Sequence, residues 1–152
     1  MATMGVELTF VDTNILIYAN VPILTENVTA RFRLDELVAL GAPLWISRQI
    51  LREYLASLTR IQSFTSPITP AALTVDIRRF ERQFEIAEDG PAVTMHLLDL
   101  LNQIPMGGKQ VHDANIVATM IAHGLKRLLT HHVADFRRFS AWIDVIPMIP
   151  IP

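Results

Sequence analysis

Short apolar runs rich in β-branched and aromatic residues alternate along this chain with longer segments of helical periodicity. Turn and cap residues bound the short runs, as they bound strands, and the longer segments repeat their apolar residues as amphipathic helices do. Parallel strands need long crossovers, usually helices, so this alternation predicts an α/β fold with a parallel sheet covered on both faces. The predicted strands are 7–11, 44–46, 84–87, 127–130 and 143–146.

The helices predicted between these strands carry recognisable start and stop signals. Ser47 is a favourable N-cap, and Thr69-Pro70 places proline at the first helical position. Gly41 and Gly124 follow two other helices, as helix-ending glycines do. The predicted helices are 27–40, 47–60, 69–83, 91–104, 113–123 and a turn at 135–141, and the phenylalanines at 32, 80, 84, 136 and 139 follow core spacing. With no repeat or linker, residues 1–152 are predicted to form one domain with an irregular, proline-containing tail at 147–152.

The composition narrows the environment and the function classes. Hydrophobic residues make up 51% of the chain, which a buried parallel sheet or an oligomer interface would use. The absence of cysteine excludes disulfides and thiolate metal sites and favours a reducing cytoplasm. Asp12 and Asn14 interrupt the apolar stretch 6–21, which is also too short to span a bilayer, so no membrane segment is expected. A net charge of −2 means that any nucleic-acid binding must rely on a local patch.

Four acidic residues fall where a parallel sheet binds ligands, at the carboxyl ends of its strands. Asp12 directly follows the first predicted strand, and Asp135 lies in the loop after the fourth. Glu53 flanks the apolar face of the helix after the second strand. Asp113 opens a strongly apolar helix, where desolvation of an unpaired carboxylate would cost several kcal/mol. A metal ion or a paired base would explain such burial better than a cap alone.

Each of these acids also has a plain structural alternative. Asp12 and Asp135 could cap the helices that follow them. Asp113 could interact favourably with the dipole of its helix, and Glu53 could be a solvated surface residue. The joint placement distinguishes the two interpretations, because four carboxylates held together repel one another unless cations neutralise them. Oxygen ligands without cysteine suit Mg²⁺ or Mn²⁺ rather than zinc.

Four blocks of the sequence resemble, in order and spacing, those of PIN-domain nucleases. They are VDTNILIYA at 11–19, SRQILREY at 47–54, HDANIVA at 112–118, and LLT at 128–130 followed by Asp135-Phe136. The resemblance extends from about residue 7 to residue 145, and within the family it is greatest to the VapC toxins of bacterial toxin–antitoxin pairs.

This resemblance implies a three-layer α/β/α fold with a five-stranded parallel sheet in the order 3-2-1-4-5. It also implies Mg²⁺- or Mn²⁺-dependent cleavage of RNA, a homodimer, and inhibition by a VapB-type antitoxin. Asp12, Glu53 and Asp113 match the family's metal-binding acids, and Asp135 matches its last acid. His132 departs from the pattern, because relatives usually carry Asn or Asp there, and an imidazole could ligate a metal or contact phosphate.

Several neighbouring residues are candidates for supporting roles. Thr13, Asn14 and Thr130 lie at the same strand ends as the acids and could orient them, although capping and turn formation are equally plausible roles. No role is predicted for His112 or His131. The candidate contacts to the RNA backbone, each of which could also be a solvated surface charge, are Arg48, Arg52, Lys109, His132, Arg137 and Arg138. The alternative function is a non-catalytic PIN-like interaction module with a degenerate acid site.

Overall fold

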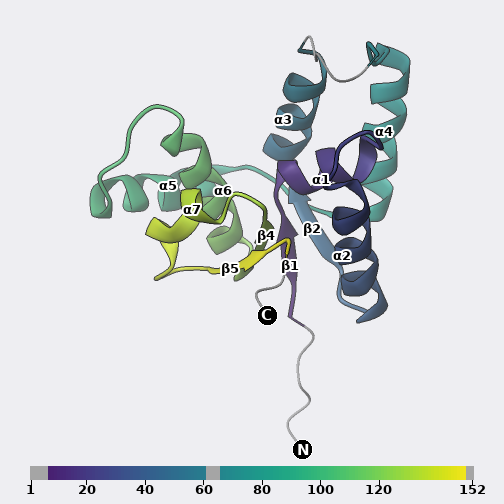
Figure 1. The fold of residues 1–152 in the computed structure, drawn as a ribbon. Helices are drawn as coiled ribbons and strands as arrows, with labels where there is room; N and C mark the ends of the chain where they lie inside the picture. Colours follow the sequence, from purple (N-terminus) through teal and green to yellow (C-terminus); the bar gives the residue numbers. More distant parts are fainter. Residues whose placement is uncertain (1–6, 61–65, 150–152) are drawn as a thin grey trace, which may run out of the picture.

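The computed structural model describes residues 7–60 and 66–149, whose five strands form one parallel sheet (Figure 1). The strand order is β3-β2-β1-β4-β5, and each neighbouring pair is parallel, which confirms the predicted topology. The strands are β1 (Thr9–Val11), β2 (Leu44–Ser47), β3 (Glu85–Ala87), β4 (Arg127–Thr130) and β5 (Asp144–Pro147).

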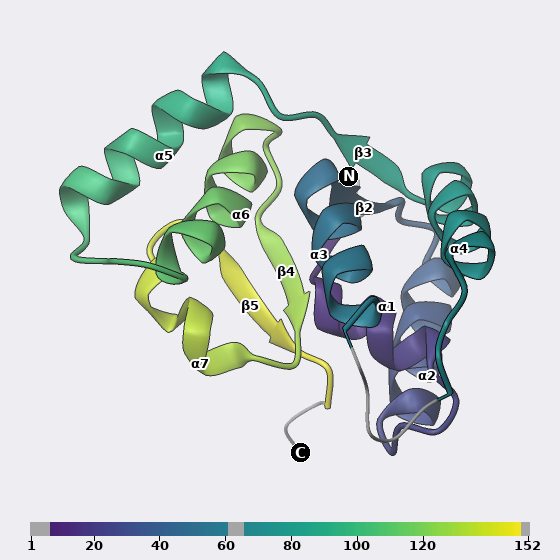
Figure 2. The same ribbon diagram turned by 90° about the horizontal axis from the view of Figure 1, so that it is seen from above.

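In Figure 1, α5 to α7 lie on the left, on the side of the molecule that carries β5, whereas α2 and α4 lie on the right, beyond β2, and α3 lies above the strands. Seen from above in Figure 2, α6 lies between α5 and β4, so α5 forms an outer layer on that side. The helices in the described residues are α1 (Thr13–Asn20), α2 (Asn27–Ala39), α3 (Arg48–Leu58), α4 (Pro70–Gln83), α5 (Pro91–Gln103), α6 (Gln110–Ala122), α7 (Val133–Phe136) and the 3-10 turn η1 (Arg137–Phe139).

Strand β1 lies at the centre of the sheet and positions the start of α1. Its residues Phe10 and Val11 are fully buried, as expected for a strand covered on both faces. Phe10 pairs in register with Trp45 of β2 and Leu128 of β4. The Asp12 amide continues this ladder by donating to the Leu129 carbonyl at 3.0 Å. Asp12 therefore lies next to the end of β4, at the carboxyl edge of the sheet.

The predicted start and stop signals agree with the structure. The Ser47 hydroxyl accepts from the Ile50 amide at 3.4 Å, and the Thr69 hydroxyl accepts from the Ala72 amide at 3.1 Å, so both act as N-caps. Gly41 and Gly124 adopt φ angles of 80° and 69°, the left-handed conformation that glycine allows without a steric penalty. Ser47 thereby fixes where α3, the helix that carries Glu53, begins.

The structure corrects several sequence-based expectations. It adds α1, which the predicted elements do not include, and α6 begins at Gln110 rather than Asp113. Pro147 belongs to β5 rather than to the tail, because Thr130 of β4 extends the pairing to it; residues 150–152 of the predicted tail lie outside the described residues. Phe32 is 66% exposed on α2 and is not a core residue, so the apolar spacing there was misleading. Helical periodicity identifies an apolar stripe but not what covers it.

The described helices also bear on membrane association. Across residues 7–60 and 66–149, each helix is too short or too polar to cross a lipid bilayer.

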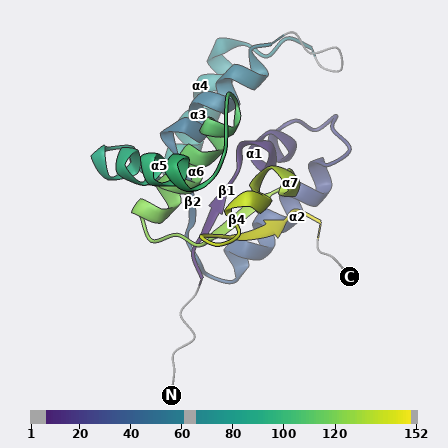
Figure 3. The same ribbon diagram turned by 90° about the vertical axis from the view of Figure 1, so that its left-hand side faces the viewer.

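Figure 3 shows α3 and α4 extending together beyond the end of the sheet to which β1 points.

Candidate active site: an acid cluster at the carboxyl edge of the sheet

Asp12 is the most deeply buried of the four predicted acids, with 6% of its surface exposed. Its Oδ1 accepts from the Thr13 amide at 2.8 Å, and its Oδ2 accepts from Asn14 Nδ2 at 2.9 Å and from the Thr130 hydroxyl at 2.8 Å. Burial raises the pKa of this carboxyl, while the hydrogen bonds from Thr130 and Thr13 oppose that rise. Asp12 is also the N-cap of α1, so the capping role and the place in the cluster coincide.

Asn14 and Thr130 connect the ends of the neighbouring strands β1 and β4. Asn14 Nδ2 also donates to the Thr130 hydroxyl at 3.2 Å, and Asn14 Oδ1 accepts from the His131 amide at 3.0 Å. The Thr130 hydroxyl accepts in turn from the His132 amide at 3.0 Å. Both side chains are buried. This network holds the Asp12 carboxylate in one orientation.

Glu53 is held at the cluster by two donors and is not a free surface carboxylate. Thr13 Oγ1 donates to Glu53 Oε2 at 2.7 Å, and Gln49 Nε2 donates to Glu53 Oε1 at 2.8 Å. Thr13 therefore joins the acid at the end of β1 to the acid on α3.

Gln49 is a part of the cluster that the sequence did not reveal. Besides its bond to Glu53, Gln49 Nε2 donates to the His112 carbonyl at 2.9 Å, and Gln49 Oε1 accepts from Asn115 Nδ2 at 2.8 Å. These bonds join α3 to the first turns of α6. The one available signal was spacing, because Gln49 precedes Glu53 by one helical turn and shares its face.

Asp113 lies in the first turn of α6 and is partly buried rather than enclosed. Its pKa is raised from 3.8 to about 6, first by burial and then by the negative charges of Asp135, Asp12 and Glu53, with Arg138 acting in the opposite direction. This mutual repulsion shows that the structure brings all four predicted acids near one another. The argument from burial applies more strongly to Asp12 than to Asp113.

Asp135 and His132 form the exposed rim of the cluster. Their side chains are 59% and 55% exposed, and His132 Nδ1 lies 4.0 Å from Asp135 Oδ2. Helix α7 begins at Val133 with His132 at its N-cap position, so Asp135 lies within the first turn. The alternative role of Asp135 as N-cap of that helix is therefore wrong.

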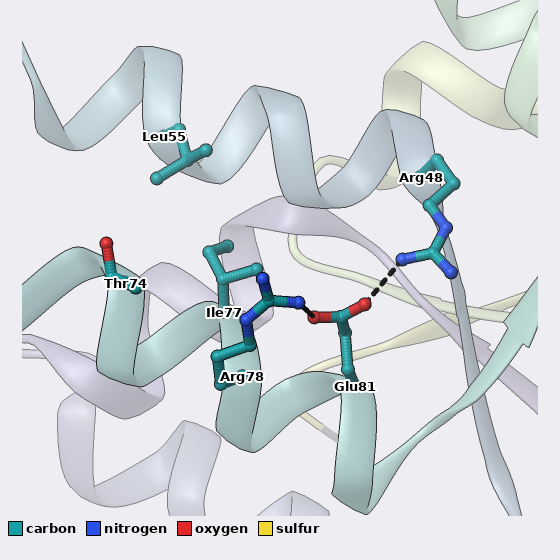
Figure 4. A pocket seen from close by; sticks show the side chains of 6 residues that line it. All are labelled: Arg48, Leu55, Thr74, Ile77, Arg78 and Glu81. Carbon is teal, nitrogen blue, oxygen red and sulfur yellow. Dashed lines mark hydrogen bonds and ion pairs between the residues drawn. The ribbon is translucent and has the colours of Figure 1, made fainter.

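The basic residues that are candidates for phosphate contacts differ in whether an acidic side chain already pairs with them. Figure 4 shows Arg48 pointing toward Glu81, to which its Nη1 donates at 2.7 Å, and its Nη2 also donates to Glu88 at 2.8 Å. Arg48 lines a cavity of about 320 Å³ between α3 and α4 that includes none of the four acids. The other candidates, Arg52, Lys109, Arg137 and Arg138, are exposed and form no ion pair with another described residue.

The chemistry of these side chains fits a hydrated divalent cation. No arginine or lysine in residues 7–60 and 66–149 forms an ion pair with any of the four acids, and the nearest imidazole nitrogen given for them, His132 Nδ1, lies 4.0 Å from Asp135 Oδ2. Within those ranges, no three acidic, cysteine or histidine side chains form a ready-made ligand set. Mg²⁺ usually keeps several waters and takes only one or two protein carboxylates, so a close-packed cage is not required.

A parallel sheet in this strand order, with acidic residues gathered at its carboxyl edge, defines an α/β protein of the PIN type. Residues 9–140 match the sequence profile of the PIN domain, and the chain belongs to the PIN domain family. No curated protein sequence matches the chain.

Solved structures show the same fold at low sequence identity. A chain of VapBC2 from Rickettsia felis, bound to a promoter DNA fragment, aligns with a TM-score of 0.66 and 20% identity over 92% of this chain and 98% of that chain. VapBC-1 from nontypeable Haemophilus influenzae aligns with a TM-score of 0.65 and 17% identity, over 93% of this chain and 98% of that chain. VapC20 from Mycobacterium tuberculosis, a toxin that cleaves the sarcin–ricin loop, aligns with a TM-score of 0.62 and 17% identity. The alignment covers 90% of this chain and 96% of that chain.

Proposed function

We propose that this chain is a divalent-cation-dependent endoribonuclease that acts as the toxin of a VapBC-type toxin–antitoxin pair. The observation that carries the proposal is the convergence of four acids from separate segments: burial and then the negative charges of Asp135, Asp12 and Glu53 raise the pKa of Asp113. Membership of the PIN domain family and the similarity to VapBC chains support the same assignment.

The proposed reaction is hydrolysis of a phosphodiester bond, and the acids would hold the cation that it requires. When bound, Mg²⁺ or Mn²⁺ would lower the pKa of the attacking water and offset the negative charge that develops on the phosphoryl oxygens. Asp12, Glu53 and Asp113 would hold the ion directly or through water, and Asp135 would complete the site from the rim. Thr13, Asn14 and Thr130 hold the first two carboxylates in fixed orientations, so less ordering is needed when the ion binds.

Exposed basic side chains would bind the RNA backbone. Lys109 directly precedes α6, which carries Asp113, and Arg137 and Arg138 follow α7, which carries Asp135. The field of Arg138 reaches Asp113, so this basic segment lies beside the cluster. Arginine suits such contacts because its planar fork matches two phosphate oxygens. Local charge would compensate for the net charge of −2.

Two exposed apolar surfaces suit the proposed protein partners. Helix α2 exposes Val28 and Phe32, which lie one turn apart on one face. Helix α5 exposes Met95, Leu98 and Leu101 along one side, and we infer that the VapB-type antitoxin and a second copy of the chain bind at these two surfaces. Apolar side chains grouped in this way indicate protein interfaces more often than isolated ones do.

A cleavage assay tests the nuclease proposal against the non-catalytic alternative. The full chain would be incubated with structured RNA in Mg²⁺, in Mn²⁺ and in EDTA, beside Asp12→Asn and Asp113→Asn. Asp144→Asn is the matched control, because Asp144 is an exposed aspartate on β5. We expect cleavage that needs a divalent ion, is lost in both cluster variants and persists in the control.

The same assay contains the outcomes that contradict the proposal. Cleavage in EDTA, or full activity in both cluster variants, would exclude the mechanism. If the folded protein cleaves no RNA but binds a VapB-type partner, the non-catalytic interaction module is the better assignment.

A further inference from the structure

The loop after β4 presents an imidazole to the acid cluster. Consecutive backbone amides attach this loop to the cluster, since the His131 amide donates to Asn14 Oδ1 and the His132 amide donates to the Thr130 hydroxyl. That hydroxyl donates to Asp12. The backbone of His132 is therefore fixed relative to the deepest carboxylate.

The His132 ring lies beside the Asp135 carboxylate, with the centroid of the His131 ring 6.2 Å from its own. Its Nδ1 is 4.0 Å from Asp135 Oδ2. The separation of 4.0 Å is too long for a hydrogen bond. Two ligands of one ion can be separated by this distance, because each ligand atom lies about 2.1 Å from the metal. More than half of each side chain is exposed, which leaves room for a hydrated ion.

The other imidazoles beside the cluster are placed differently. The His131 ring packs edge-on against Tyr18, with the ring centroids 5.5 Å apart. His112 contributes its backbone carbonyl to Gln49, and its side chain is exposed. Among the histidines in the described residues, His132 is the one with a ring nitrogen within 4.0 Å of a carboxylate oxygen, that of Asp135.

We propose that His132 supplies an imidazole-nitrogen ligand, beside Asp135, to the divalent cation of this site, and so favours Mn²⁺ over Mg²⁺. This inference rests on the proposed function, because it assumes that the acid cluster binds a cation. Imidazole suits first-row transition ions, whereas Mg²⁺ takes oxygen ligands and water. Carboxylates suit both ions, so the nitrogen at position 132 determines the preference.

Pulsed electron paramagnetic resonance on the Mn²⁺-loaded full chain tests the proposal directly, without using activity. We expect the spectrum of the unsubstituted protein to show coupling to a directly coordinated imidazole nitrogen. His132→Asn should remove this coupling, and by titration calorimetry it should lower the Mn²⁺ affinity by about tenfold while the Mg²⁺ affinity changes little.

Two matched variants separate His132 from its neighbours. His131→Phe keeps a ring against Tyr18 but has no ring nitrogen, and His112→Gln removes the imidazole before Asp113. Both should retain the nitrogen coupling. Loss of the coupling in either variant with retention in His132→Asn would overturn the assignment.

Failure of the inference is distinguishable from failure of the proposed function. If Mn²⁺ binds and binding is lost in Asp12→Asn, but the unsubstituted protein shows no imidazole coupling, the cluster binds metal and the His132 proposal is wrong. If Mn²⁺ binding is unaffected by Asp12→Asn or is not detected, the metal site of the proposed function fails, and the His132 proposal fails with it.

Discussion

Thr13 Oγ1 donates a hydrogen bond of 2.7 Å to Glu53 Oε2, which joins the first residue of α1 to the middle of α3. The Thr13 amide donates to Asp12 Oδ1 at 2.8 Å, so one threonine holds two acids from different parts of the chain. The relative orientation of Asp12 and Glu53 therefore depends on this residue.

We expect Thr13→Val to lower cleavage activity by about 10- to 100-fold, the range seen when a group that orients a metal ligand is lost. The substitution removes the hydroxyl and keeps nearly the same side-chain shape. The hydrogen bond from the backbone amide of residue 13 to Asp12 Oδ1 stays in place. The measurement is the rate of RNA cleavage at saturating Mn²⁺. Thr94→Val, at an exposed position on α5, is the control and should retain activity. An unchanged rate in Thr13→Val would show that Glu53 does not need this support.

The stability of the metal-free protein should fall as the pH rises through the titration of Asp113. Its pKa is raised from 3.8 to about 6, so the folded protein holds this proton more tightly than the unfolded chain does. The cost of ionisation is absent well below the unfolded value, grows between the two values and is complete above about pH 6.

Asp113→Asn should therefore stabilise the metal-free protein at pH 7.5. We expect the melting temperature in EDTA to rise by about 2–4 °C, which corresponds to about 1 kcal/mol after solvent screening of this partly exposed group. Most of the gain should disappear at pH 4, and saturating Mn²⁺ should reverse the order of the two proteins. A variant less stable than the unsubstituted protein in EDTA at pH 7.5 would contradict the repulsion argument.

The salt dependence of RNA binding should distinguish Arg137 from Arg48. Arg137 is exposed and has no ion pair within the described residues, whereas Arg48 is bound by Glu81 and Glu88. Measured in an Asp12→Asn background without metal, Arg137→Gln should weaken binding and reduce the slope of log affinity against log salt by roughly one. Arg48→Gln should change this slope much less. Equal effects would mean that Arg48 leaves its ion pairs when RNA binds.

Gly124→Ala should destabilise the fold by about 1–2 kcal/mol, the cost of placing a side chain in the left-handed region. Gly124 has a φ of 69° and ends α6 with two hydrogen bonds: its own amide donates to Ile121, and the Leu125 amide donates to Met120. Urea denaturation measures the change. Gly107→Ala is the control, because Gly107 has no positive φ and an added Cβ there meets no atom within 4 Å.

The sequence by itself determined most of the local elements, and it placed Asp12 at the end of the first strand and Glu53 on the helix after the second. The Ser47 and Thr69 caps, the helix-ending glycines and the aspartate after the first strand are encoded within a few residues, and the structure agrees with all of them. Such signals are readable because capping and helix termination depend on neighbours no more than about one turn away. The blocks that resemble the PIN family supplied the strand order.

Only the tertiary structure decided which side chains support the acids and which are exposed. Gln49 contacts Asn115 across 66 residues, and Asn14 contacts Thr130 across 116, so these bonds depend on how α3, α6 and β4 pack rather than on local preference. Packing also left Asp12 more buried than Asp113, paired Arg48 with Glu81, and exposed Phe32. In each case the deciding quantity is distance through space, which the spacing of residues along a single helix or strand does not specify.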